Sequence, residues 1–375
     1  MGVGQRPTVL IIYGSSIRVI ILRILYLINH AGNGGSEKYV KVLSEGLKNV
    51  EIFFGYNETG LLVSQMESLG AKVFNVKMKS PFDLKAAKQI AVICKENEID
   101  IIHAQFPREN YIAILSKLYG NRAKVVYTSH INVNNNLVWK IMNFLITRKN
   151  SAVIAVCNSV KHLLISNNYP QDKIHVIFNG VGYEDYEGNN IEDTPFIFVV
   201  LARLSAEKGI LFLLESIKTL STETNKPFKL LLAGEGPLEA EAKNYVTENN
   251  LSEFVDFLGY TTNPKEVLST GHVFINSSES EALSFAILEA MTMGLPVIAT
   301  NVGGNPDIIN DSTNCGILVA YNNPSEMATA MKTMMEDKDL YAKFSKNSRF
   351  AIKNTFDIKI MISKTQKMYK DILKD

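Results

Sequence analysis

The sequence predicts an α/β protein of two doubly wound domains, in which each parallel sheet lies between layers of helices. Short apolar runs of strand length alternate along the chain with longer segments of helical periodicity. These runs are nearly continuous, as expected for strands buried on both faces. The alternation stops at the polar segment 182–194 and then restarts. A chain of 375 residues therefore divides into two similar halves, as is usual for this length.

Each half contains six expected strands. In the first half they span residues 24–28 (within an apolar run that starts at 23), 50–54, 72–76, 101–104, 124–128 and 152–156. In the second half they span residues 196–202, 229–233, 254–258, 272–276, 296–300 and 316–320. The clearest helical patterns cover residues 37–47, 84–95, 111–118, 209–220, 283–293 and 358–373. We therefore expect an extension of unknown role at 1–20, a first domain at 21–185, a second domain at 195–355, and a C-terminal helix at 356–375 that crosses back to the first domain.

Charge and cysteine content exclude some classes of protein. The net charge is +1, so no overall basic field is available for binding nucleic acid. The three cysteines, Cys94, Cys157 and Cys315, have neither metal-ligand spacing nor the even number of a disulfide framework. They fit buried thiols in a reducing compartment, and we expect a cytoplasmic protein.

The apolar run 8–28 raises the question of a membrane span. Arg18 and Arg23 oppose it, because each would cost roughly 2.5–3.5 kcal/mol near the centre of a bilayer. No small-residue cleavage site follows the run, so a signal peptide fits no better. We expect the first core strand near the end of this run.

Two segments at the ends of expected strands are candidate anion sites. Residues 32–37 (GNGGSE) open a helix, and glycines there let backbone N–H groups approach a diphosphate. A tight strand-to-helix turn would explain the same residues. Residues 202–209 (ARLSAEKG) contain Arg203 and Lys208, which could neutralise a diphosphate. The alternative is a solvated charge pair.

A third segment, residues 277–291, combines carboxylates with a helix start. Glu281 is expected just before the helix and Glu289 inside it. The N–H groups of residues 282–285 are expected to be the free donors at the helix N-terminus. Such a site could hold sugar hydroxyls and a phosphate together. Two glutamates eight positions apart mean little alone, because Glu207 and Glu215 share that spacing on an expected solvated helix face.

Five segments occur together in an order that resembles family 4 retaining glycosyltransferases of GT-B fold, whose two Rossmann-like domains face each other across a cleft. They are GGSEKY, ARLSAEKG, LLLAGEGP, VDFLGY and SESEALSFAILEAMTMGLPVIATNVGG. The resemblance runs from about residue 23 to the carboxyl end. It implies that the first domain binds the acceptor and that the second binds a nucleotide sugar.

The resemblance also implies roles for individual residues. Glu281 matches a glutamate that contacts the donor sugar, Glu289 one that binds ribose hydroxyls, and His130 a histidine near the reacting centre. The implied catalytic residues are His130, Glu281, Arg203 and Lys208. The implied donor-binding residues are Gly34, Gly35, Arg203, Lys208, Gly234, Leu258, Glu281, Ala282, Leu283, Ser284, Phe285 and Glu289.

The implied reaction transfers a hexose from a nucleoside diphosphate to an acceptor hydroxyl with retention of configuration. The resemblance favours UDP over GDP as the nucleotide, and it implies a role in polysaccharide or glycolipid synthesis. The acceptor would be a sugar or a lipid-linked glycan. We expect no cofactor and no metal, because cations would neutralise the diphosphate and the segment 337–339 (DKD) lies in the helical tail. Two alternatives remain: a non-catalytic partner subunit and a nicotinamide-dependent oxidoreductase, although the full glycine fingerprint of the latter is missing.

Residues 136–149 (NLVWKIMNFLITRK) bear on the acceptor. They mix apolar residues with cations and could form a helix on the inner face of the plasma membrane, reaching a lipid-linked acceptor. A helix packed on its own sheet would have the same pattern.

Overall fold

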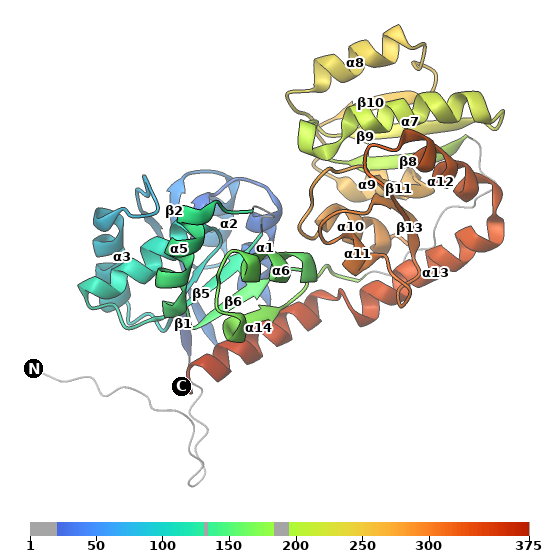
Figure 1. Cartoon of the computed structure of the whole chain (residues 1–375). Helices are drawn as coiled ribbons and strands as arrows, with labels where there is room; N and C mark the ends of the chain where they lie inside the picture. Colours follow the sequence, from blue (N-terminus) through green and yellow to red (C-terminus); the bar gives the residue numbers. More distant parts are fainter. Residues whose placement is uncertain (1–20, 131–133, 184–194, 375) are drawn as a thin grey trace, which may run out of the picture. The chain divides into compact units, whose positions relative to one another are not determined.

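The computed structural model describes residues 21–130, 134–183 and 195–374. They form two compact units (Figure 1). The first takes in the chain up to Val156, Val160–Ile177 and the residues from Ile362 onward, and the second consists of Cys157–Ser159 and Phe178–Met361. The expected extension 1–20 and residues 184–194 of the expected linker lie outside the described residues.

The first unit contains a seven-stranded parallel sheet in the order β3-β2-β1-β4-β5-β6-β7. Its strands are β1 (Leu22–His30), β2 (Val50–Glu58), β3 (Lys72–Asn75), β4 (Ile101–Ala104), β5 (Lys124–Ser129), β6 (Ala152–Ala155) and β7 (Ile174–Val176). Six of them match the expected strands, and β7 was not predicted. Its three residues are too few to produce a pattern.

The helices of this unit are α1 (Gly35–Gly46), α2 (Leu61–Ser68), α3 (Leu84–Glu96), α4 (Pro107–Leu115), α5 (Leu137–Ile146), α6 (Asn158–Ser166) and, at the chain end, α14 (Ile358–Ile372). One face of the sheet packs through Leu25, Leu27 and Ile102 against apolar residues of α3 and α4. The helix expected at 111–118 begins earlier, at Pro107, because proline is well suited to the first turn.

Buried hydrogen bonds tie α14 to the other face of this sheet. His103, on β4, has its Nδ1 2.6 Å from the Tyr369 hydroxyl and its Nε2 2.6 Å from the Thr128 hydroxyl. The Tyr39 hydroxyl lies 3.3 Å from the same Thr128 oxygen. All four residues are buried, so the network fixes the C-terminal half of α14 in the core of the first unit.

The second unit contains a six-stranded parallel sheet in the order β10-β9-β8-β11-β12-β13. Its strands are β8 (Phe196–Leu201), β9 (Phe228–Ala233), β10 (Val255–Gly259), β11 (Val273–Asn276), β12 (Val297–Thr300) and β13 (Gly316–Val319). All six were expected, with bounds that differ by one or two residues, as helix and strand ends do between definitions.

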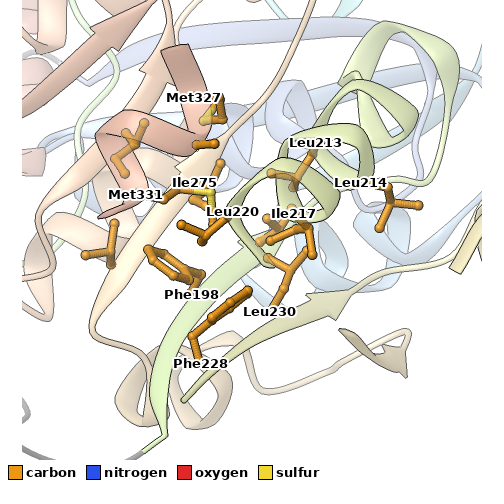
Figure 2. Close-up of a cluster of buried hydrophobic side chains, with 14 of the residues drawn as sticks. Phe198, Leu213, Leu214, Ile217, Leu220, Phe228, Leu230, Ile275, Met327 and Met331 are labelled. Carbon is orange, nitrogen blue, oxygen red and sulfur yellow. The ribbon is translucent and has the colours of Figure 1, made fainter. Parts of the chain in front are cut away.

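The helices of this unit are α7 (Ile210–Glu223), α8 (Glu239–Glu248), α9 (Pro264–Thr270), α10 (Phe285–Thr292), α11 (Asn305–Ile308), α12 (Pro324–Glu336) and α13 (Lys338–Asn354). Figure 2 shows the core on one face of the sheet, where Phe198 and Leu230 of the strands meet Leu213 and Ile217 of α7 and Met331 of α12. Burial of these side chains is the main force that holds α7 and α12 on the sheet.

Both sheets reverse their strand order once, between β1 and β4 in the first unit and between β8 and β11 in the second. The prediction of two doubly wound parallel units is thus confirmed. Cys94, Cys157 and Cys315 are all buried, also as predicted. Among the described residues, no helix combines the length and the apolar character needed to cross a bilayer.

Candidate active site

The candidate donor site lies in the second unit, where the strand order reverses. β8 and β11 are neighbours in the sheet although β9 and β10 separate them in the chain. The chain after β8 passes through the short 3-10 helix η4 (Ala206–Lys208) into α7, and the chain after β11 leads to α10. In open α/β sheets, ligands bind beyond the carboxyl ends of the strands at such a reversal.

Hydrogen bonds join the loops that follow these two strands. The Ser277 hydroxyl donates to the carbonyl oxygen of Lys208 at 2.8 Å, and the Glu279 amide donates to the carbonyl oxygen of Glu207 at 2.9 Å. Gly209 permits the close approach, because it has a φ of 62° and a Cβ there would lie 2.0 Å from the carbonyl oxygen of Ser277. The two loops therefore form one connected surface.

Lys208 and Glu281 meet on this surface. Lys208 Nζ lies 2.7 Å from Glu281 Oε2, and the Ser278 hydroxyl donates to the same oxygen at 3.0 Å. The side chains are 26% and 13% exposed, so the pair is better shielded from solvent than an ordinary surface ion pair. Two charge-assisted hydrogen bonds, one from an ammonium and one from a hydroxyl, orient the carboxylate. The site thus presents a cation beside a fixed carboxylate.

Two glycines hold the backbone of this carboxylate loop. Gly303 has a φ of 53°, and a Cβ there would lie 1.6 Å from the carbonyl oxygen of Glu281. A Cβ at Gly304 would lie 1.8 Å from the carbonyl oxygen of Ala282, and the Gly304 amide donates to the Glu281 carbonyl at 3.3 Å. A larger residue at either position would displace the loop that carries Glu281.

The helix after this loop begins later than expected. Glu281 precedes α10 and Glu289 lies inside it, as predicted, but the first helical residue is Phe285. Ser284 is the N-cap, and its hydroxyl accepts the amide hydrogen of Ile287 at 3.4 Å. The N-terminal N–H groups of this helix therefore start at Ser284, and the assignment of Ala282 and Leu283 to them was wrong.

Ala282 and Leu283 belong to the loop that precedes α10. The Asn179 side-chain amide donates to the carbonyl oxygen of Leu283 at 3.1 Å, and Leu283 is buried. The hydrogen bond from Asn179, which is 104 positions away in the chain, thus helps to fix the backbone of this loop.

The other implied donor residues of the second half lie on the same edge of the sheet. Arg203 is exposed and lies two residues beyond β8. Gly234 directly follows β9, and Leu258, near the end of β10, is 45% exposed. Glu289 is the fifth residue of α10. The fold thus places residues from four strands on the carboxyl edge of one sheet.

The implied phosphate loop of the first half opens α1. Gly34 precedes this helix and Gly35 is its first residue. Glu37 accepts a hydrogen bond from the Ser36 hydroxyl at 2.6 Å, and its carboxylate lies so close that a Cβ at Gly34 would be 2.9 Å from Oε2. A carboxylate near a helix N-terminus is favoured by the helix dipole. Any side chain at position 34 would displace Glu37.

His130 directly follows β5 in the first unit. Its Nε2 lies 2.9 Å from Gln105 Oε1, and its ring packs edge-to-face on Tyr39 with centroids 4.9 Å apart. Burial lowers the pKa of His130 to about 3. The imidazole is therefore neutral near pH 7, with one nitrogen as a donor and the other as an acceptor.

Sequence reasoning missed two buried polar residues of the first unit, Gln105 and Glu109. Gln105 follows β4 and contacts His130 directly. Glu109, in the first turn of α4, is fully buried, and neither carboxylate oxygen has a well-formed hydrogen bond to a described residue. Burial raises the pKa of Glu109 to about 7. Glutamate is ordinarily exposed in the first turn of a helix. Nothing in the sequence around Glu109 therefore predicts that it is buried.

Two family models match successive parts of the chain. The model for Glycosyltransferase Family 4 matches residues 33–184, and the model for Glycosyl transferases group 1 matches residues 184–350. N-acetyl-alpha-D-glucosaminyl L-malate synthase of Bacillus anthracis is 25% identical over 322 residues, which are 80% of this chain and 82% of that protein.

Two further proteins are similar over most of the chain. UDP-Gal:alpha-D-GlcNAc-diphosphoundecaprenol alpha-1,3-galactosyltransferase of Escherichia coli is 26% identical over 312 residues, 78% of this chain and 80% of that protein. The crystal structure of a glycosyltransferase from Rickettsia africae has a TM-score of 0.82 at 25% identity and covers 94% of this chain and 99% of that one. The chain therefore belongs to the family 4 glycosyltransferases of GT-B fold, which act in glycan and glycolipid biosynthesis.

Proposed function

We propose that the protein transfers a hexose from a nucleoside diphosphate to an acceptor hydroxyl with retention of anomeric configuration. The observation that carries the proposal is the joining of the loops after β8 and β11, which sets Lys208 Nζ 2.7 Å from Glu281 Oε2. A nucleotide sugar carries a diphosphate next to a sugar, so one such ligand could meet the cation through its phosphate and the carboxylate through its hydroxyls.

The catalytic task is positioning together with stabilisation of the departing diphosphate. Lys208 and Arg203 would neutralise the negative charge that develops on the leaving phosphate. N–H groups at the start of α10 would donate to the phosphate oxygens, and we propose a phosphate-binding role for Gly34 and Gly35 as well. In this scheme the acceptor attacks the face from which the diphosphate leaves, and a phosphate oxygen takes its proton.

Within the donor site, the remaining residues would fix the ligand. Glu281 would accept hydrogen bonds from the sugar hydroxyls, and Glu289 would accept those of the ribose. Leu258 offers an exposed apolar surface to the base, and the tight backbone at Gly234 lies beside it at the next strand end. His130 is the fourth proposed catalytic residue, beside Arg203, Lys208 and Glu281.

We also propose that transfer needs no metal ion. The Asp337-Lys338-Asp339 segment is engaged elsewhere, because Asp337 caps α13 by accepting the Leu340 amide hydrogen at 2.9 Å. The charge of the diphosphate would be met by Arg203 and Lys208 instead. The proposal is wrong if turnover of the purified protein is lost in chelator and returns only with a divalent cation.

UDP is the proposed nucleotide, because the similar E. coli enzyme is named for a UDP-Gal donor. The experiment is to follow UDP-glucose, UDP-galactose and their N-acetyl forms by proton NMR while the protein acts on them. The proposal expects the sugar that first leaves the donor to keep the α configuration. An initial β product would rule out retention, and release from GDP-sugars alone would rule out UDP.

The acceptor is proposed to be a lipid-linked glycan at a membrane surface. The similar E. coli enzyme is named for a diphosphoundecaprenol-linked acceptor. Of the residues of α5, only Asn143 is fully buried, whereas Leu137, Val138 and Leu145 are 73%, 67% and 61% exposed. The other side of α5 packs on its own unit, with Trp139 against Tyr111 and Ile146 against the core. The alternative of a helix packed on its own sheet thus describes one face of α5, and the membrane proposal concerns the exposed face.

Cationic side chains lie within and directly after α5, close in sequence to its exposed apolar residues. Lys140 lies within α5, and Arg148 and Lys149 follow it, with the Arg148 guanidinium 3.9 Å from the centroid of the Phe144 ring. An exposed apolar helix with flanking cations has the composition of a helix that lies on an anionic lipid surface. Binding there would hold the acceptor-binding unit near lipid-linked substrates.

A further inference from the structure

Gln105 and His130 lie side by side because the strands that precede them are neighbours. β4 and β5 are paired in parallel, with Ala104 opposite Tyr127. Gln105 follows the last residue of β4 and His130 follows the last residue of β5, so both lie at the carboxyl edge of the sheet. There, Gln105 Oε1 lies 2.9 Å from His130 Nε2. The Gln105 backbone amide donates to the Leu27 carbonyl oxygen at 3.1 Å, which fixes the residue to β1.

The orientation of the Gln105 side-chain amide follows from its other contact. Its Nε2 donates to the carbonyl oxygen of His103 at 3.2 Å, and a carbonyl oxygen can only accept. A reversed amide would set two acceptors against each other in a site where Gln105 is fully buried. The oxygen of the amide therefore faces His130, and the imidazole nitrogen opposite it must carry the hydrogen.

We infer that Gln105 is a positioning residue that holds His130 in the Nε2–H tautomer and so reserves the Nδ1 lone pair for a hydroxyl of the sugar or the acceptor. The inference rests on the proposed function, in which His130 lies near the reacting sugar. The ring cannot easily turn away, because Tyr39 packs on it at 4.9 Å and Phe106 at 6.0 Å between centroids. Burial keeps the imidazole neutral, since it lowers the pKa of His130 to about 3.

The first test reads the tautomer directly in the full-length protein. Histidine labelled with ¹⁵N is observed by long-range proton–nitrogen correlation, and the His130 signals are assigned with a His130→Gln variant. The wild-type ring is expected to carry its hydrogen on Nε2 between about pH 6 and 8. Gln105→Met fills the same space without an acceptor and should give a mixture of tautomers. A wild-type Nδ1–H form, or an unchanged spectrum in Gln105→Met, overturns the inference.

The second test separates positioning from folding. In Gln105→Met we expect kcat to fall about tenfold or more while KM for the nucleotide sugar stays within about twofold. In Gln105→Glu the carboxylate still accepts the Nε2 hydrogen but favours the charged imidazolium. That variant should lose activity on the acid side of the pH range in which the wild type works, because imidazolium has no free lone pair.

Gln89→Met is the matched control. Gln89 is an exposed glutamine of the same unit whose side-chain amide donates to the Asn75 carbonyl oxygen, and its loss should leave the spectrum and the kinetics unchanged. Wild-type kcat in Gln105→Met despite a changed tautomer overturns the positioning role. If the wild type transfers no sugar, the proposed function fails, and the NMR result still decides the tautomer.

Discussion

Lys208 and Glu281 form an ion pair, with 2.7 Å between Nζ and Oε2, although they are 73 positions apart in the chain. Each lies in a loop at the carboxyl end of one of the two strands where the sheet order reverses. Backbone and side-chain hydrogen bonds join the loops, so the relative position of the two charges is set by the fold of the second unit alone.

Removing either cation should slow turnover far more than it destabilises the protein. We expect Lys208→Ala and Arg203→Ala to reduce kcat by about 10²–10³, because each loses a donor that strengthens as charge develops on the diphosphate. Steady-state kinetics with the preferred nucleotide sugar measure the effect. Lys229→Ala is the control, since Lys229 pairs with Asp256 at 3.2 Å elsewhere on the sheet. Near-normal kcat in Arg203→Ala or Lys208→Ala contradicts the assigned role.

Gly303→Ala should damage the site through the backbone. The new Cβ would lie 1.6 Å from the carbonyl oxygen of Glu281, at a φ of 53° that disfavours alanine. We expect a lower Tm, a loss of stability on the order of 1–3 kcal/mol and weaker nucleotide binding. In Gly182→Ala, by contrast, the new Cβ meets no atom within 4 Å, so this control should behave as the wild type. Equal Tm values for the two variants would refute the steric account.

Glu109 should make stability depend on pH. Burial raises its pKa in the folded protein to about 7, whereas an unfolded chain has the ordinary value near 4. Between these values the folded protein holds a proton that the unfolded chain has released, so the free energy of unfolding falls as pH rises. Glu109→Gln removes the charge. It should be more stable than the wild type by on the order of 1–3 kcal/mol above about pH 7, with the difference vanishing below about pH 4.

Denaturant unfolding at several pH values measures this difference. His103 and His130 act in the opposite direction: desolvation lowers the pKa of both to about 3, so their contribution to stability rises with pH up to the ordinary value near 6.5. Because both proteins contain these histidines, the comparison of variant with wild type isolates Glu109. Glu67→Gln, at an exposed glutamate of α2, is the control. A pH-independent difference in Glu109→Gln would count against a buried, protonated carboxyl.

Charges placed on the exposed face of α5 should weaken membrane binding. We expect Leu137→Glu with Val138→Glu to reduce co-sedimentation with vesicles rich in anionic lipid at least several-fold, with little change in Tm because both side chains are exposed. Phe350→Glu is a matched control on α13, where Phe350 is 66% exposed. Co-sedimentation that is unaffected by the substitutions, or by the anionic lipid content, would exclude α5 as the contact.

The strands could be predicted from the sequence because burial on both faces leaves a strong local pattern. β4 has the expected bounds, the other expected strands except β2 differ by one or two residues at an end, and β2 runs four residues beyond its expected end. β7 has no such pattern, because it is three residues long and contains the polar His175. The predicted start of α10 was two residues too early. A serine can occupy either the first turn of a helix or the N-cap position, and the hydrogen bond from the Ile287 amide to the Ser284 hydroxyl identifies Ser284 as the N-cap.

The contacts within the site could not be predicted in this way. Glu281 and Lys208 were chosen separately, and their ion pair depends on β8 and β11 being adjacent in space. Gln105 has no distinguishing sequence pattern. Its side-chain amide donates to the His103 carbonyl oxygen and accepts from His130. His130 reaches Gln105 because β4 and β5 are paired.

The central claim is that the second unit binds a nucleoside diphosphate through the loops after β8 and β11. The most direct measurement is thermal stabilisation by UDP, GDP, ADP and NAD, with and without EDTA, in the wild type and in Lys208→Ala. A ligand at 100 times its Kd should add roughly 2.7 kcal/mol of stability. We expect a selective, EDTA-insensitive shift with UDP that is much reduced in Lys208→Ala. A shift with NAD alone, or a UDP shift of equal size in the variant, would contradict it.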